Sequence, residues 1–338
     1  MKMRSVDIAL SDNGKVDAVD YLKGFSIFTI ALMHLIQMMS NVPSILNKLS
    51  AIGGTGVHVF FLCSGLGLYL SYLKKKTTFT QFLKKRFVKI YIPYLIVVLV
   101  SFFVPWMYSG DDRIAALLSH VFLYKMFIPK YESSFGIHFW FVSTIIQFYI
   151  VFIPLCLLKS KLKRKEIFAL ICLLISICWW VFCYIYGVAE IRVWSSSFLQ
   201  YIWEFALGMV LAECLYNGKK FKINILVLIV ASLLGIGLQA VMALKSETLK
   251  IFNDIPGLIG YTSLALLFMC IPFIKKCAEW LSKISYEYYL IHILVFASAM
   301  HFSPKDSLVF QTVIGLAGMA VAIVIAFFYH KLVKKITR

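Results

Sequence analysis

A histidine and a lysine stand in the first long apolar stretch of the sequence, at a spacing that suits chemistry. His34 lies 11 residues after Lys23. In a helix this separation is about three turns, or about 16 Å, so both side chains would share one face. A neutral imidazole can take a proton from an attacking hydroxyl group close to neutral pH. His34 is therefore a candidate general base, and a structural hydrogen bond between helices is the alternative.

Three more ionisable residues lie in or beside apolar stretches. His58 follows a glycine-rich segment, His138 precedes Trp140 at the start of a stretch, and Glu204 lies near the middle of another. A buried carboxylate can orient a histidine, but it can equally belong to a structural pair. We take Lys23, His58, His138 and Glu204 as supporting or acceptor-side candidates. His292 follows several tyrosines of interfacial type, which favours a structural role for that residue.

Two basic residues precede the third apolar stretch. Arg86 and Lys89 are three positions apart and would be neighbours on a helix that enters this stretch through Pro93. Paired cations suit phosphate groups, which nucleotides and coenzyme A carry in number, although charges that only orient the chain would explain them equally well. The eight cysteines form no CxxC pair, so we expect small buried residues and predict no disulfide framework and no metal site.

Composition indicates which elements must position these residues. The 338 residues are 61% hydrophobic and 15% charged, which is more apolar than soluble domains are. Lipid must therefore be the solvent, and a span needs about 20 apolar residues. We predict a single all-α transmembrane domain over residues 1–338, with ten helices at about 21–39, 52–73, 91–108, 139–158, 167–187, 196–216, 223–244, 256–274, 284–302 and 308–332.

The net charge of +18 would suggest nucleic acid in a soluble protein, but here the basic residues gather in alternate loops. By the positive-inside rule they face the cytosol, and both chain ends lie there with them. We expect no nucleic-acid partner and no cleavable signal peptide. The cytosolic set is Lys74–Lys76, Lys84–Arg86, Lys89, Lys159, Lys161, Lys163–Lys165, Lys219, Lys220, Lys222, Lys275, Lys276, Lys283, Lys331, Lys334, Lys335 and Arg338, and the opposite loops carry Asp111, Asp112, Glu132, Glu190, Glu247, Asp254 and Asp306.

Two shorter segments complete the pattern. Residues 77–89 mix aromatic and basic side chains and predict an amphipathic helix on the cytosolic surface, leading into the third span. Residues 114–128 form a short apolar run that carries His120 and Lys125. We interpret this run as a re-entrant or interfacial helix.

In this order, the motifs resemble those of acyltransferase family 3, whose members acylate carbohydrates and other cell-surface molecules. The resemblance covers nearly the whole chain. Lys23 and His34 are similar to the family's Arg and His, which ten residues separate, although lysine replaces arginine, as it does at Lys89. His58 stands where an acidic residue is frequent. The matching segments are Asp20–Gly24, Gly56–Gly65, Arg86–Pro93, His138–Phe141 and Ser285–His292.

The resemblance implies a membrane O-acyltransferase of the bacterial cytoplasmic membrane. Its donor would be acyl-CoA, usually acetyl-CoA, with Arg86 and Lys89 as donor contacts and His34 as the catalytic base or acyl carrier. Its acceptor would be a hydroxyl of a carbohydrate or a lipid-linked glycan. The alternative is a transporter or flippase for a lipid-linked or small anionic substrate, which buried His and Glu residues would also suit. That alternative predicts no acyl transfer.

Overall fold

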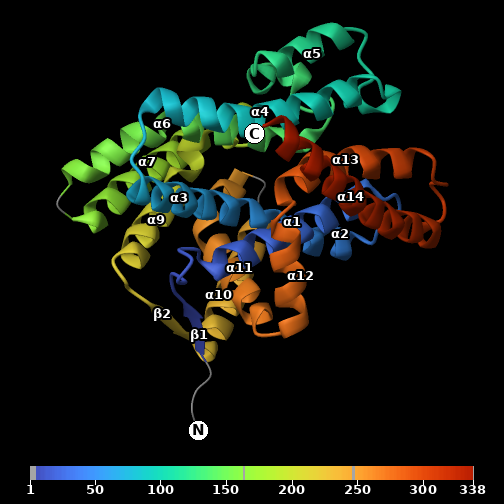
Figure 1. Cartoon of the computed structure of the whole chain (residues 1–338). Helices are drawn as coiled ribbons and strands as arrows, with labels where there is room; N and C mark the ends of the chain where they lie inside the picture. Colours follow the sequence, from blue (N-terminus) through green and yellow to red (C-terminus); the bar gives the residue numbers. More distant parts are fainter. Residues whose placement is uncertain (1–4, 163, 246–247, 338) are drawn as a thin grey trace. The chain divides into compact units, whose positions relative to one another are not determined.

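The computed structural model describes residues 5–162, 164–245 and 248–337, and nearly all of its regular structure is helical (Figure 1). Three of the loop charges named above, Lys163, Glu247 and Arg338, lie outside the described residues. The chain separates into two compact units that interleave in sequence. Unit 1 takes its described residues from 1–28, 54–78 and 150–283, and unit 2 from 29–53, 79–149 and 284–338. Helices α1 (Asp17–Met38) and α6 (Trp140–Lys161) each contribute to both units.

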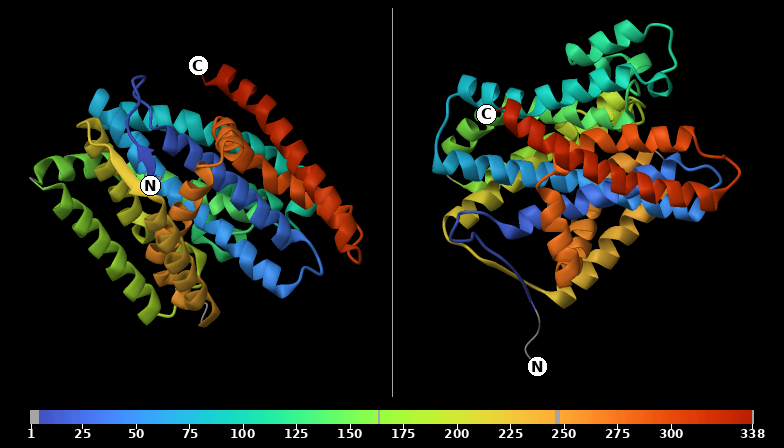
Figure 2. Two further views of the ribbon diagram at one scale, coloured as in Figure 1. Left: turned by 90° about the horizontal axis from the view of Figure 1, so that it is seen from below. Right: turned by 45° about the vertical axis from the view of Figure 1, so that its right-hand side comes forward.

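Unit 1 is a helical unit with one small ribbon of two strands. Strands β1 (Ser5–Ile8) and β2 (Phe221–Asn224) pair antiparallel, and they lie side by side in Figures 1 and 2. The other elements of the unit are α3 (Gly56–Lys74), α7 (Lys165–Ile185), α8 (Arg192–Ser195), α9 (Phe198–Tyr216), α10 (Ile225–Lys245), η6 (Thr248–Phe252), α11 (Asp254–Met269) and α12 (Pro272–Ser282).

Two glycines let α3 and α9 approach to backbone contact. A Cβ atom on Gly65 would lie 2.0 Å from the carbonyl oxygen of Phe205, and one on Gly208 would lie 2.1 Å from that of Leu62. Small residues at such crossings are the usual means of close helix packing in membranes. Through this crossing, side chains of the two helices can meet in the interior of unit 1.

Unit 2 contains the end of α1, the start of α6 and two long helices that pack against each other, α13 (Ser285–His301) and α14 (Leu308–Ile336). Side chains tie these helices to α4 (Phe79–Phe102): the hydroxyl of Tyr286 donates to the carbonyl of Ile90, and that of Tyr329 to the carbonyl of Pro93. The remaining elements are α2 (Ser44–Ser50), α5 (Arg113–Val121) and the 3-10 turns η2 (Pro105–Met107), η3 (Lys125–Phe127), η4 (Pro129–Tyr131) and η5 (Ile137–Phe139). Turn η1 (Ala51–Thr55) joins α2 to α3.

The all-α polytopic class is confirmed. In the described part of the chain, seven helices are long and apolar enough to cross a membrane, and they coincide with seven of the ten predicted ranges. The predicted range 256–274 is a pair of helices, α11 and α12, bent by 115°. Pro272 opens α12, and because a proline disfavours the helical conformation of the residue before it, Ile271 is extended (φ −94°, ψ 110°).

The two remaining ranges are helical but shorter or more charged than expected. In place of a span over 91–108, α4 runs from Phe79 to Phe102, so that the predicted amphipathic segment and the third span form one continuous helix. Helix α13 has 17 residues, or about 26 Å, slightly less than the about 30 Å of a hydrocarbon core. The run 114–128 contains α5 and a 3-10 turn. All eight cysteines are free, but Cys178, Cys270 and Cys277 are exposed on the protein surface, contrary to the expectation that all are buried.

Candidate functional site

His34 on α1 contacts His292 on α13 within unit 2. The Nδ1 atom of His34 lies 2.8 Å from Nε2 of His292, and the two rings stack at 5.1 Å. The other nitrogen of His292, Nδ1, lies 2.7 Å from the carbonyl oxygen of Tyr289. Because a carbonyl can only accept, Nδ1 of His292 must carry a proton, and Nε2 of His292 then accepts one from Nδ1 of His34. This assignment from the hydrogen-bond network leaves the lone pair of the neutral His34 ring on Nε2.

A third imidazole adjoins this pair. The ring of His138 lies 5.0 Å from that of His292 and 6.4 Å from that of His34. It is buried, and neither of its nitrogens has a hydrogen-bond partner among the described residues. Gly136 makes the turn before it at φ +143°, where a Cβ atom would lie 2.7 Å from the ring of His138. Only glycine therefore fits at this position.

A lysine is buried in the same unit, and the sequence did not predict it as a site residue. Lys125 on η3 is completely buried, its Nζ atom donates to the carbonyl of Gly136 at 3.3 Å, and the same atom lies 5.7 Å from the ring centre of Phe139. Its signal in the sequence was a cation inside an apolar run, which marks functional residues in membrane proteins. We call His34, His138, His292 and Lys125 the imidazole cluster.

The residues predicted to contact the acyl donor, Arg86 and Lys89, lie on α4. The Nε atom of Arg86 is buried without a hydrogen-bond partner, and its guanidinium lies over the ring of Phe82 at 5.5 Å. Among the described residues, neither Arg86 nor Lys89 forms an ion pair. Partial burial and the neighbouring charges of Arg86 and Lys85 lower the pKa of Lys89, so an added anion would relieve this repulsion.

A hydrogen bond between α4 and α13 shows where Arg86 and Lys89 lie along α13. Ile90, the residue after Lys89, accepts from Tyr286 at 2.7 Å. His292 follows Tyr286 by six residues, which is about 9 Å along α13. Arg86 and Lys89 therefore lie toward the end of α13 that precedes His292.

A cavity of about 260 Å³ lies at the carboxyl-terminal ends of α1 and α13. Met38 and Ala297 line it, and they follow His34 and His292 by four and five residues, or about 6 and 7.5 Å along their helices. Trp106 and Gln311 also line the cavity. It is slightly smaller than a typical small-molecule pocket, which suits a ligand of about one ring.

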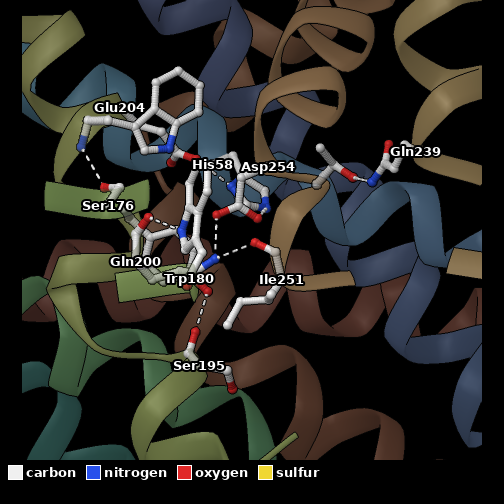
Figure 3. A network of polar contacts seen from close by, with 12 residues as sticks. His58, Ser176, Trp180, Ser195, Gln200, Glu204, Gln239, Ile251 and Asp254 are labelled. Atoms are coloured by element: carbon white, nitrogen blue, oxygen red, sulfur yellow. Dashed lines mark hydrogen bonds and ion pairs between the residues drawn. The ribbon is translucent and has the colours of Figure 1, made fainter. Parts of the chain in front are cut away.

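A second cluster of ionisable side chains lies in unit 1 (Figure 3). Nδ1 of His58, on α3, lies 2.6 Å from Oε1 of Glu204, on α9, and Nε2 of His58 lies 3.8 Å from Oδ1 of Asp254, at the start of α11. Gln200, one turn before Glu204, donates to Oδ2 of Asp254 at 2.7 Å. We call His58, Glu204 and Asp254 the carboxylate cluster.

The structure thus groups the predicted residues in two places and adds others. His34 and His138 join His292, which the sequence favoured as a structural residue, and Lys125. His58 and Glu204 join Asp254, which the sequence placed among the loop acids. Lys23 lies half-buried on α1 in unit 1, and α1 is unbroken from Lys23 to His34, as the spacing of these two residues requires.

Comparison with known proteins gives one match. The model of acyltransferase family 3, described as an acyltransferase domain, matches residues 16–329, which include every residue of both clusters. No curated protein and no solved structure matches the chain.

Proposed function

Since this chain belongs to acyltransferase family 3 and is a membrane acyltransferase, we propose that it moves an acetyl group from cytosolic acetyl-CoA to a hydroxyl of a cell-surface carbohydrate or its precursor. One observation supports this assignment most directly. The chain of hydrogen bonds from His34 through His292 to the carbonyl of Tyr289 makes Nε2 of His34 the basic nitrogen of its ring.

In the proposed reaction His34 acts as a general base. Its Nε2 takes the proton of the acceptor hydroxyl while the hydroxyl oxygen attacks the thioester carbonyl carbon. The C–S bond then breaks, the acetyl group stays on the acceptor oxygen, and the leaving thiolate takes the proton from Nε2. His292 fixes the orientation of the His34 ring and stabilises its protonated form, as the partner of a catalytic histidine does elsewhere.

The basic character of the cluster suits this reaction. Negative charge develops on the carbonyl oxygen and then on the sulfur, and preorganised donors and cations stabilise such charge strongly in a dry site. Lys125 and His138 would supply them, since both are buried in the same unit.

The two substrates would approach the imidazole cluster from opposite ends. The phosphates of acetyl-CoA would bind Arg86 and Lys89, and the pantetheine arm would reach along α13 toward His34. The acceptor would occupy the cavity lined by Trp106 and Gln311. The protein would lie in the bacterial cytoplasmic membrane with both ends of the chain in the cytosol, as the distribution of its basic loop residues favours.

Two measurements test the proposal. Purified protein in lipid vesicles should convert acetyl-CoA to free coenzyme A when an extract of cell-surface glycans is present, and mass spectrometry of the glycans should show an added acetyl mass. Deleting the gene should remove that mass from the cell surface. A transporter would give neither result, and unchanged glycans together with intact acetyl-CoA would refute the proposed function.

The same preparation tests the role of His34. Rapid quenching after mixing with radioactive acetyl-CoA, without acceptor, should give no labelled protein if His34 is a base. Label that stays on wild-type protein and is lost in His34→Ala would identify His34 as an acyl carrier instead.

A further inference from the structure

The carboxylate cluster has more negative charge than its own residues can neutralise. Two carboxylates face one imidazole, so that even a protonated His58 leaves one negative charge. Within residues 5–162, 164–245 and 248–337, no lysine or arginine forms an ion pair with Glu204 or Asp254. An isolated charge in a low-dielectric interior is costly, so the cluster favours one further positive species, which is either a proton or a bound cation.

One oxygen atom in the cluster has no hydrogen-bond partner in the described part of the chain. Glu204 is completely buried, and its Oε2 atom accepts no hydrogen bond from any described residue. Its other oxygen, Oε1, lies 2.6 Å from Nδ1 of His58. A buried carboxylate oxygen without a donor costs free energy, and a bound cation would remove this cost.

The surrounding residues hold the three side chains in place. Gln200 donates through Nε2 both to Oδ2 of Asp254 at 2.7 Å and to the carbonyl of Ile251 at 3.1 Å, which leaves Oδ1 of Asp254 on the side of His58 (Figure 3). Outer contacts of this kind orient the ligands of metal ions. One ligand atom from each of His58, Glu204 and Asp254 lies within 4.8 Å of the others.

We infer that His58, Glu204 and Asp254 bind one divalent first-row transition ion, with Zn²⁺ as its representative. An imidazole nitrogen favours such ions over Mg²⁺ and Ca²⁺, which prefer oxygen ligands alone, and no thiol is part of the set. Zinc takes nitrogen and oxygen ligands at about 2.0 to 2.2 Å, so the three side chains would shift to surround the ion, and the 2.6 Å contact between His58 and Glu204 would open. The proton shared by His58 and Glu204 would leave as the ion binds.

This inference is independent of the proposed acyl transfer. The three ligands come from α3, α9 and α11, and the ion would link these helices inside unit 1. Cysteine and histidine spacing did not predict it, because each ligand lies on a different helix and no two are close in sequence.

The test uses the full-length protein in detergent, purified through a tag without histidines. The protein is stripped with a chelator, incubated with Zn²⁺, freed of unbound metal and analysed by mass spectrometry for zinc. We expect about one Zn²⁺ per chain and a higher unfolding temperature with Zn²⁺ than without it. In the near-isosteric variants Glu204→Gln and Asp254→Asn, the zinc retained should fall by about fivefold or more relative to wild type.

A matched control comes from another imidazole and carboxylate pair. His330 and Glu287 lie 3.0 Å apart but form no three-ligand group with a second carboxylate of the described chain, so Glu287→Gln should retain as much zinc as wild type. Cobalt gives a readout that needs no variant: Co²⁺ bound to wild type should show visible absorption that Zn²⁺ abolishes.

Two results would overturn the inference. One is wild-type protein that holds no more zinc than the double variant Glu204→Gln/Asp254→Asn and shows no cobalt absorption. The other is equal zinc in all variants, which would place the metal elsewhere. In the first case the positive species in the cluster is a proton, and lowering the pH rather than adding Zn²⁺ would raise the unfolding temperature.

Discussion

The imidazole cluster and the carboxylate cluster are both buried groups of ionisable side chains, but they differ in the sign of charge that they favour. The first contains three imidazoles and an ammonium group, and the second contains two carboxylates and one imidazole. A low-dielectric interior strengthens electrostatic interactions, so the first suits a developing anion and the second a bound cation. The comparison teaches that a buried histidine by itself indicates little, and that its neighbours decide which chemistry it can perform.

The largest effect that would separate the two clusters is expected from His34→Ala. Loss of a general base lowers kcat by about 10² to 10⁴-fold, so acetyl transfer should nearly vanish. The same variant should still bind zinc, because it leaves the carboxylate cluster intact. His330→Gln, which alters a histidine with a carboxylate partner, serves as the control. Activity of His34→Ala within about tenfold of wild type would contradict the assignment.

His292→Phe tests whether His292 orients His34. The variant keeps an aromatic ring but loses the hydrogen bond to Nδ1 of His34. We expect kcat to fall by about 10 to 100-fold with little change in KM for acetyl-CoA, and the pH profile of kcat to shift, because the base loses its partner. His292→Gln, whose amide can accept the same hydrogen bond, should recover part of the rate. A change in KM alone would contradict this role.

Gly65→Ala would disturb the helix crossing that holds the carboxylate cluster. Its Cβ atom would lie 2.0 Å from the carbonyl of Phe205, which should cost about 1 to 3 kcal/mol of unfolding free energy and weaken zinc retention. Gly67→Ala is the control, since Gly67 lies on the same helix and a Cβ atom there would meet no atom within 4 Å. Thermal unfolding in detergent compares the two. Equal unfolding temperatures would show that α3 and α9 can move apart freely.

Arg86→Ala should act on binding rather than on chemistry. Removing one cation from a phosphate site is expected to raise KM for acetyl-CoA by about tenfold while kcat stays within about twofold, and to reduce the dependence of KM on salt. Lys84→Ala, two residues earlier and exposed, should leave KM unchanged. A fall in kcat instead would place Arg86 in the chemical step.

The smallest effect is expected at Asp112, a carboxylate that, unlike Glu204, accepts hydrogen bonds from several side chains. Lys130, Tyr131 and Tyr108 donate to Asp112 and hold the pKa of its carboxyl group below the ordinary value of 3.8. A lowered pKa means that Asp112 stabilises the folded state fully above pH 3.8 and progressively less below it. The unfolding temperature of Asp112→Asn should therefore be slightly below that of wild type near neutral pH, and the difference should shrink on acidification. A difference in unfolding temperature that does not change with pH would contradict this role of Asp112, whose partners distinguish it from Glu204.

Much of the fold could be predicted because helices in lipid follow from local sequence. An apolar stretch of sufficient length must form a helix, since no water is present to pair its backbone groups. Where charged residues or a proline interrupt an apolar stretch, the prediction was less accurate. The basic residues of α4 and the proline that opens α12 changed the lengths and directions of two predicted spans.

The sequence by itself determined the helical membrane class, the family motifs and the choice of His34, because each depends on local composition or spacing. Only the tertiary structure decided which side chains meet. His34 and His292 are 258 residues apart and His58 and Glu204 are 146 apart, so their contacts depend on the rotation and depth of packed helices. Those quantities are set by points of close packing such as Gly65 and Gly208, where apolar periodicity carries no information about the partner helix.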